Sequence, residues 1–239
     1  MKAIITADLH LVNELNSLSQ RHQNAHILNF EQQLIFFDRI FHIKPDLFII
    51  AGDLLDYLVY TPSQLDKIIT IFKKLKEAGI LIIFIQGNHD LDYPFLEKLK
   101  TYAVVVANED NKNSGFIMPD FKIVYKKLLF DKTLFHFVNY TESRKLLKKI
   151  EFDDSKYNVL ISHTLISGLK NDRVTPIFCE LAPSDFVKFY HVFTGHIHHR
   201  QDFKNITVIG SPYMKNSAYY NVILYDTQTG RHNRIEINI

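Results

Sequence analysis

The first third of the chain alternates short apolar runs with longer segments in which apolar residues recur at helical spacing. The short runs Ala3–Thr6, Leu47–Ala51 and Ile80–Ile85 are rich in β-branched residues and predict strands. Between them, Phe30–Phe41 and Leu65–Leu75 predict helices. This order indicates βαβ units, and strands this apolar are expected to be covered on both faces of a partly parallel sheet.

From Phe116 onward the pattern changes to paired strand candidates. Phe121–Leu128 and Thr133–Val138 predict the first pair, and Glu142–Ile150 predicts a basic helix. Further strand runs follow at Val159–Ser162, Val192–Thr194, Thr207–Ile209, Ala218–Tyr225 and Arg234–Ile239. The fold class that fits this order best is α/β, a four-layer αββα sandwich of two mixed β-sheets with helices outside.

Nothing in the composition divides the chain. Repeats, low-complexity tracts and Pro/Gly/Ser linkers are absent, so we expect a single domain over residues 1–239, with Asn108–Gly115 as its most mobile loop. The 46% of hydrophobic residues can fill a substantial core. Lys and Arg number 28 against 26 Asp and Glu, and a net charge of +2 neither requires nor excludes a DNA partner.

The amino terminus and the cysteine usage indicate a cytoplasmic location. The single cysteine, Cys179, cannot form an internal disulfide, and Asp8 follows Met1 before any apolar signal region develops. The longest apolar runs are far shorter than the roughly 20 residues that a membrane-spanning helix needs. We therefore expect no membrane insertion.

Five of the apolar strand runs end in side chains that bind metals. The clusters are Asp8-Leu9-His10, Gly52-Asp53, Gly87-Asn88-His89-Asp90, Ser162-His163 and Gly195-His196-Ile197-His198. Loops past the carboxyl ends of α/β strands deliver their side chains to one crevice. The sequence therefore predicts a metal site at the strand carboxyl ends.

Each ligand type has a physical role at its spacing. In an extended chain Asp8 and His10 point to the same side, so that a carboxylate oxygen and an imidazole nitrogen can reach one ion. His196 and His198 have the same spacing. Asp53 is the natural bridging ligand, because a carboxylate can offer an oxygen to each of two cations and offset their mutual repulsion.

The donor set also bears on the choice of metal. Asn88 supplies a neutral amide oxygen, which limits the negative charge in the site, and Gly52, Gly87 and Gly195 let the backbone approach the ions without a Cβ in the way. Oxygen and imidazole donors without thiolate suit manganese, iron or zinc better than calcium or copper(I). We expect two divalent ions, with Mn²⁺ favoured and Fe²⁺, Zn²⁺ or Mg²⁺ as alternatives.

These five motifs, in this order and over nearly the whole chain, resemble the pattern of the calcineurin-like metallophosphoesterases. The resemblance implies that one ion is held by Asp8, His10, Asp53 and His198, and the other by Asp53, Asn88, His163 and His196. It also implies that a hydroxide activated by the two metals attacks phosphorus. His89 would then bind no metal and assist the transition state or the leaving oxygen, with Asp90 orienting it.

Within that superfamily the chain looks most similar to the Mre11/SbcD-like DNA repair nucleases. The segments that carry this likeness are Ala7-Asp8-Leu9-His10-Leu11, Gly87-Asn88-His89-Asp90 and Gly210-Ser211-Pro212. The resemblance implies a metal-dependent nuclease whose substrate is DNA. Asp56 stands where some relatives carry a His linked to exonuclease action, and bacterial SbcD-like proteins resemble this chain in having Asp there. From the residues alone we expect Asp56 to be a surface or core residue.

The resemblance also bears on protein partners. The chain stops about 27 residues after Pro212, which leaves no room for the capping domain and ATPase-binding helices of full-length relatives. This puts a Rad50/SbcC-type ATPase partner in question. Homodimerisation through helices near Leu65–Leu75 or Tyr93–Lys100 is suggested by family analogy only.

Two other functions remain open at this stage. A phosphodiesterase or phosphatase acting on a small nucleotide would use the same site chemistry, and would differ from a nuclease in having a closed pocket instead of an open, positively charged groove. A non-catalytic scaffold is disfavoured, because it has no use for His89. His42, His136, His191 and His232 are expected to be structural or surface residues.

Overall fold

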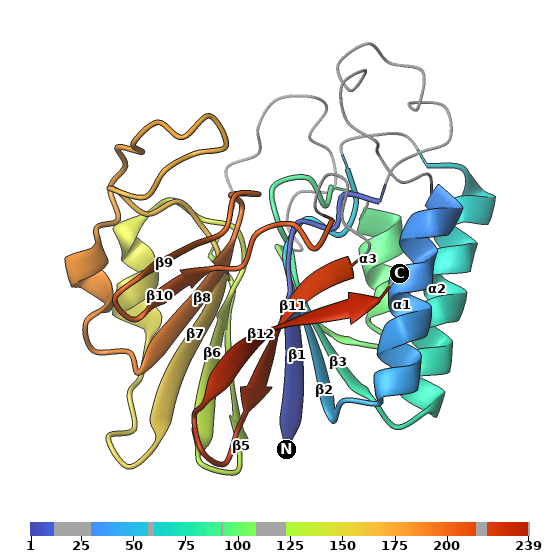
Figure 1. The fold of residues 1–239 in the computed structure, drawn as a ribbon, viewed down its shortest axis with the longest axis horizontal. Coiled ribbons are helices and arrows are strands. Elements are labelled where there is room, and N and C mark those ends of the chain that lie inside the picture. Colours follow the sequence, from blue (N-terminus) through green and yellow to red (C-terminus); the bar gives the residue numbers. More distant parts are fainter. Residues whose placement is uncertain (12–29, 57–59, 92, 109–122, 214–218, 239) are drawn as a thin grey trace.

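The computed structural model describes residues 1–11, 30–56, 60–91, 93–108, 123–213 and 219–238. Two six-stranded sheets pack face to face, and α-helices cover the outer face of the first sheet (Figure 1). Apart from Asn108, the loop predicted to be most mobile lies outside the described residues.

The first sheet has the strand order β12-β11-β1-β2-β3-β4. Its parallel strands are β1 (Lys2–Thr6), β2 (Leu47–Ala51), β3 (Leu81–Ile85) and β4 (Val104–Val106), and its antiparallel pair is β11 (Tyr219–Asp226) and β12 (His232–Asn238). The covering helices are α1 (Phe30–Ile43), α2 (Pro62–Glu77) and α3 (Tyr93–Leu99). The predicted βαβ organisation is confirmed.

The second sheet has the order β5-β6-β7-β8-β10-β9. Its strands are β5 (Tyr125–Phe130), β6 (Thr133–Val138), β7 (Tyr157–His163), β8 (His191–Gly195), β9 (Gln201–Phe203) and β10 (Ile206–Val208). The four central strands run parallel, and the two edge strands are antiparallel to their neighbours. Both sheets are therefore mixed, as predicted.

The outer face of the second sheet is covered differently. Two 3₁₀ helices lie in its connections: η3 (Arg144–Lys149) lies between β6 and β7, and η4 (Pro183–Phe186) lies between β7 and β8. A helix was predicted over Glu142–Ile150, and the observed helix is shorter and of the 3₁₀ type. Leu146 is buried, and Leu147 and Ile150 are partly buried against the same core cluster, so a short 3₁₀ turn is enough to seat these side chains.

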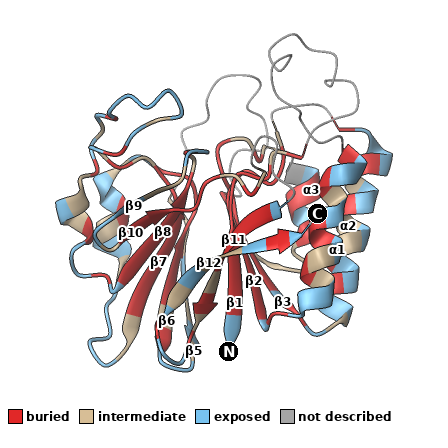
Figure 2. Ribbon diagram, in the orientation of Figure 1, coloured by how far each residue is buried: buried red, intermediate tan, exposed pale blue. Residues whose placement is uncertain are grey.

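The core lies in layers on both faces of the first sheet. Ile5 and Ile49 face Phe137, Ile161 and Phe193 of the second sheet, and all five are fully buried. On the other face, a second cluster joins the sheet to its helices. The buried strands in Figure 2 show this double coverage, which confirms the prediction for β1 to β3. Since each buried side chain of this size stabilises the fold by about 1.5–3 kcal/mol, the strands form a rigid frame for the loops at their ends.

Helix α2 begins at a capping box. The hydroxyl of Thr61 accepts from the backbone N–H of Gln64, the Gln64 side chain accepts from the backbone N–H of Thr61, and Pro62 opens the helix. None of the helices in the described part of the chain combines the length and apolar character needed to cross a bilayer.

Candidate metal centre

The loops after β1, β2, β3, β7 and β8 meet along one edge of the two sheets, at the top of Figure 1. Backbone contacts link them: the N–H of Asp8 donates to the carbonyl of Gly52 (3.1 Å), and that of His10 donates to the carbonyl of Asp53 (2.9 Å). The N–H of His196 donates to Oδ1 of Asp8 (2.9 Å), which joins the second sheet to the first.

Asp8, His10 and His198 form the first group of possible ligands, with one donor atom from each lying within 4.8 Å of the others. Nε2 of His10 lies 2.9 Å from Nε2 of His198. Asp8 is fully buried, and burial raises its pKa to about 6 against the opposing charges of His163 and His198.

Asp53, His163 and His196 form the second group. Oδ1 of Asn88 lies 2.7 Å from Nδ1 of His196 and 3.2 Å from Nε2 of His163, so the predicted amide ligand is part of the same cluster. Asp53 lies between the two groups: its Oδ2 is 3.1 Å from Nε2 of His163 and 3.6 Å from Nε2 of His10. All seven side chains predicted as ligands thus converge.

The histidines of the cluster differ in the direction in which their pKa values are shifted. Burial lowers the pKa of both His10 and His196 to about 3, so that both imidazoles are neutral and have a nitrogen lone pair to offer a cation. Burial opposes ionisation of Asp53, yet the charge of His163 and its hydrogen bond hold the Asp53 pKa below its usual range. Conversely, Asp53 overcomes the effect of burial on His163 and raises its pKa to about 9.

The backbone at these positions is in an unusual conformation. Asp8, His10, Asp53 and His196 have φ values of 53°, 40°, 52° and 82°. Non-glycine residues rarely adopt positive φ, at a cost of about 1–3 kcal/mol each, and such conformations gather at functional sites. Four of the eight non-glycine residues with positive φ in the described chain are predicted ligands, so the strain is concentrated here.

The glycines beside the ligands make room for side chains. A Cβ on Gly52, which has φ +88°, would collide with the ring of His163, and a Cβ on Gly87 would collide with Oδ1 of Asp53. The glycines at these two positions therefore admit the ligand side chains to their places, while the predicted approach of the backbone to the ions stays a prediction.

The residues present fit two divalent cations. Oδ2 of Asp8 is buried and has no hydrogen-bond partner among the described residues, which is costly for a carboxylate unless a cation meets it. The two facing Nε2 atoms of His10 and His198 also suit a shared cation better than each other. The donors are carboxylate, amide and imidazole, while Sγ of Cys179 contacts the carbonyl of Leu181 elsewhere in the fold.

The structure pairs His89 with a residue for which the sequence predicted no role. Nδ1 of His89 lies 2.8 Å from Oδ1 of Asp56, and both side chains are about one-fifth exposed. Burial opposes protonation of His89, but the hydrogen bond to Asp56 and the charge of Asp53 raise its pKa. The sequence predicted a surface or core position for Asp56 and did not predict its contact with His89.

Asp90 occupies a different place from the one expected. Its carboxylate accepts the backbone N–H groups of Asp53 (2.9 Å), Leu55 (2.9 Å) and Gly87 (2.8 Å). Burial raises its pKa to about 7, helped by the charge of Asp53. Asp90 therefore shapes the two loops that carry Asp53 and Asn88, and Asp56 takes the place beside Nδ1 of His89 that was predicted for Asp90.

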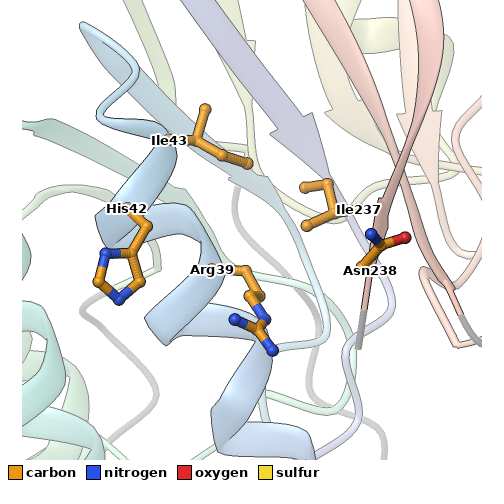
Figure 3. A pocket seen from close by; sticks show the side chains of 5 residues that line it. All are labelled: Arg39, His42, Ile43, Ile237 and Asn238. Carbon is orange, nitrogen blue, oxygen red and sulfur yellow. The ribbon is translucent and has the colours of Figure 1, made fainter.

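The other histidines singled out in the sequence lie apart from this centre. His136 contacts Tyr125 and Asn158, and His191 packs against His232. His42 lines a separate surface pocket between α1 and β12 with Arg39, Ile43, Ile237 and Asn238 (Figure 3).

Comparisons with known proteins give consistent results. The family model described as calcineurin-like phosphoesterase matches residues 1–200. The chain is 30% identical, over 218 aligned residues, to a Staphylococcus saprophyticus protein named as the D subunit of the nuclease SbcCD. That alignment covers 83% of this chain and 57% of the relative, so the chain spans little more than half of the relative's length.

Solved structures share the fold at low sequence identity. A crystal structure of a Thermus thermophilus protein is similar with a TM-score of 0.56 and 10% identity, covering 98% of each chain. A dimetal phosphatase from Danio rerio is similar with a TM-score of 0.52 and 12% identity, covering 100% of this chain and 98% of its own. At these identities the likeness concerns the fold alone.

Proposed function

The chain belongs to the calcineurin-like phosphoesterases, hydrolases of phosphoester bonds that use a dinuclear divalent metal site, and from that premise we propose that it is a DNA nuclease. The observation that carries the choice of DNA is the similarity to a protein named as part of a nuclease. We further propose that residues 1–239 act as one metallophosphoesterase domain.

We assign the ligands by the two clusters. Asp8, His10 and His198 would hold one ion, while Asn88, His163 and His196 would hold the other, with Asp53 between them as the shared ligand. Carboxylate, amide and imidazole donors without thiolate suit manganese, iron or zinc, and among these we propose manganese. Ions held here supply Lewis acidity, which neutralises charge on the non-bridging oxygens of a phosphodiester and lowers the pKa of water toward neutrality.

His89 and Asp56 would handle the leaving group. With Nδ1 of His89 bonded to Asp56, Nε2 is the ring nitrogen that would face the substrate, and the raised pKa favours the protonated imidazole. Such a group can stabilise charge on the phosphate or donate a proton to the departing oxygen. The backbone N–H of His89 donates to Oδ1 of Asp53 (2.9 Å), which ties this residue to the shared ligand.

Hydrogen bonds to the backbone hold the loops and the ligands in place. Asp90 accepts from the backbone of both the β2 and β3 loops, and Nδ1 of His163 donates to the carbonyl of Ala51 (2.8 Å). These contacts fix ligand positions before any ion binds, which reduces the reorganisation that binding would otherwise require.

The test is digestion of labelled single- and double-stranded DNA by the purified protein with Mn²⁺, beside a chelated control. A small generic phosphodiester is assayed alongside. His89→Ala is compared with His42→Ala, a matched change at an exposed histidine of α1. DNA breakdown that needs both metal and His89 but not His42 would support the nuclease function. Turnover of the small ester with intact DNA would overturn it and indicate a small-molecule phosphodiesterase.

A further inference from the structure

A hairpin stands beside the metal centre in the connection that follows β7. The N–H of Gly168 donates to the carbonyl of Ile177 (2.9 Å), and that of Ile177 donates to the carbonyl of Leu169 (2.8 Å). Leu169 and Ile177 are buried, which anchors the base of the hairpin in the core. At its tip, Asn171 accepts from the backbone of the turn.

Asp172, in this turn, contacts the loop that carries the metal ligands. Its Oδ1 accepts from the backbone N–H of His198 (2.9 Å) and of His199 (3.0 Å), and its Oδ2 lies 3.4 Å from Nδ1 of His198. Gln201 makes a second clamp, because its side chain bonds both the N–H (2.8 Å) and the carbonyl (2.6 Å) of Lys170. The hairpin and the ligand loop are thus fastened at two points.

His198 differs from the other ligands in its surroundings. Its side chain is 48% exposed, whereas that of His163 is fully buried and is oriented by the carbonyl of Ala51. Because Nε2 of His198 faces His10, Nδ1 is the outward nitrogen, and Asp172 is the carboxylate beside it.

We propose that Asp172 is a positioning residue that holds His198 as a metal ligand, an inference that rests on the two-ion site of the proposed function. A carboxylate beside Nδ1 favours the tautomer with the proton on that nitrogen, which leaves the Nε2 lone pair facing the ion. The same carboxylate fixes the backbone of His198, so both the ring and its attachment are oriented.

The experiment is a calorimetric titration of the metal-stripped, full-length protein with Mn²⁺. Asp172→Asn and Asp172→Ala are compared with Asp154→Asn, which makes the same charge change at an exposed position away from the hairpin. The wild type and the control should bind two ions with equal affinity. Both Asp172 variants should bind one of the two ions roughly 10- to 100-fold more weakly and leave the other unaffected.

Asp172→Asn separates the two contacts of the carboxylate, because its amide oxygen can still accept from the backbone of His198 and His199. Weakened binding in both variants, with unchanged unfolding midpoints, supports positioning of the imidazole. Wild-type affinity in Asp172→Asn would overturn the proposal, whatever the effect of alanine. Intact two-ion binding by a wild type that leaves DNA uncut would overturn the DNA substrate and leave the role of Asp172 standing.

Discussion

Histidines lie at the start of strand β8 and just past its end, and the two groups differ in the partners that surround their rings. At its start, Nε2 of His191 lies 3.0 Å from the hydroxyl of Thr207, which donates to Asp202, and its ring packs on His232 with centroids 4.2 Å apart. Past its end, His196 and His198 face the amide oxygen of Asn88 and a ring nitrogen of His10.

These two environments separate a structural histidine from a candidate ligand. At the start of β8 the polar partners are satisfied by one another. At the far end, the nitrogens converge with a carboxylate oxygen of Asp8 that has no partner among the described residues, and the backbone takes positive φ at His196. A buried carboxylate oxygen without a partner, beside ligands held at positive φ, marks the site, whereas burial alone does not.

The largest effect should come from Asp53, the residue shared by both clusters. Asp53→Asn keeps the shape of the side chain but removes the charge that offsets two cations, so both ions should be lost and activity should fall to that of the chelated control. Metal analysis beside the activity assay measures this. Two bound ions with full activity in Asp53→Asn would contradict the assignment of Asp53 as the shared ligand.

His89→Ala should be next in size. We expect activity to fall by roughly 10²- to 10⁴-fold, because a positioned proton donor is lost, while two ions remain bound. Steady-state kinetics and metal content, measured on one preparation, check both halves. Loss of metal together with activity would place His89 among the ligands. His10, Asp53 and His89 also have donor atoms close enough together to hold one ion.

At the start of β8 the expected effect concerns stability and not turnover. Burial lowers the pKa of His191 to about 4, with a contribution from His232, so the folded protein binds this proton less readily than the unfolded chain. Its stabilising contribution is complete above about pH 6.5 and declines as the pH falls toward 4, by about 3 kcal/mol in all.

His191→Gln removes the titrating group and retains an amide that can bond Thr207. Denaturant unfolding of both proteins at pH 7 and pH 4 should show a smaller acid loss in the variant, with metal binding at neutral pH unchanged. Equal acid losses in the two proteins would contradict the assignment of this titration to His191.

Asp56→Asn should lower activity less than His89→Ala does. The amide can still contact Nδ1 of His89 but no longer favours its protonated form, so we expect a loss of roughly 10- to 100-fold in kcat with both ions retained. Steady-state kinetics and metal content measure both expectations. A kcat that Asp56→Glu, which keeps the charge, does not restore would argue that Asp56 supports the loop and not the imidazole.

The sequence predicted most of this arrangement because the strand runs and the ligand motifs are local patterns. Leu47–Ala51 was predicted with its observed bounds, and the clusters after it were recognised from short spacings. Contacts made across space were not predictable in this way. Asp172 lies nine positions past His163 in an irregular connection, and only the fold brings it to His198.

The roles of two acidic residues show the same limit. Asp56 and Asp90 both lie near His89, at the ends of neighbouring strands, and nothing in their spacing tells which carboxylate meets the ring and which meets the backbone. The choice depends on how the loops after β2 and β3 fold over each other. Similarly, the residues of Glu142–Ile150 indicated a helix but not that it would be a short 3₁₀ turn over Arg144–Lys149.

The most direct test of the metal centre is a crystal structure of the protein grown with Mn²⁺, with anomalous diffraction recorded at the manganese edge. We predict two anomalous peaks at the carboxyl end of β8, one among Asp8, His10 and His198 and one among Asn88, His163 and His196, with Asp53 touching both. A map without peaks there, or with its strongest peak between His191 and His232, would contradict the two-ion centre.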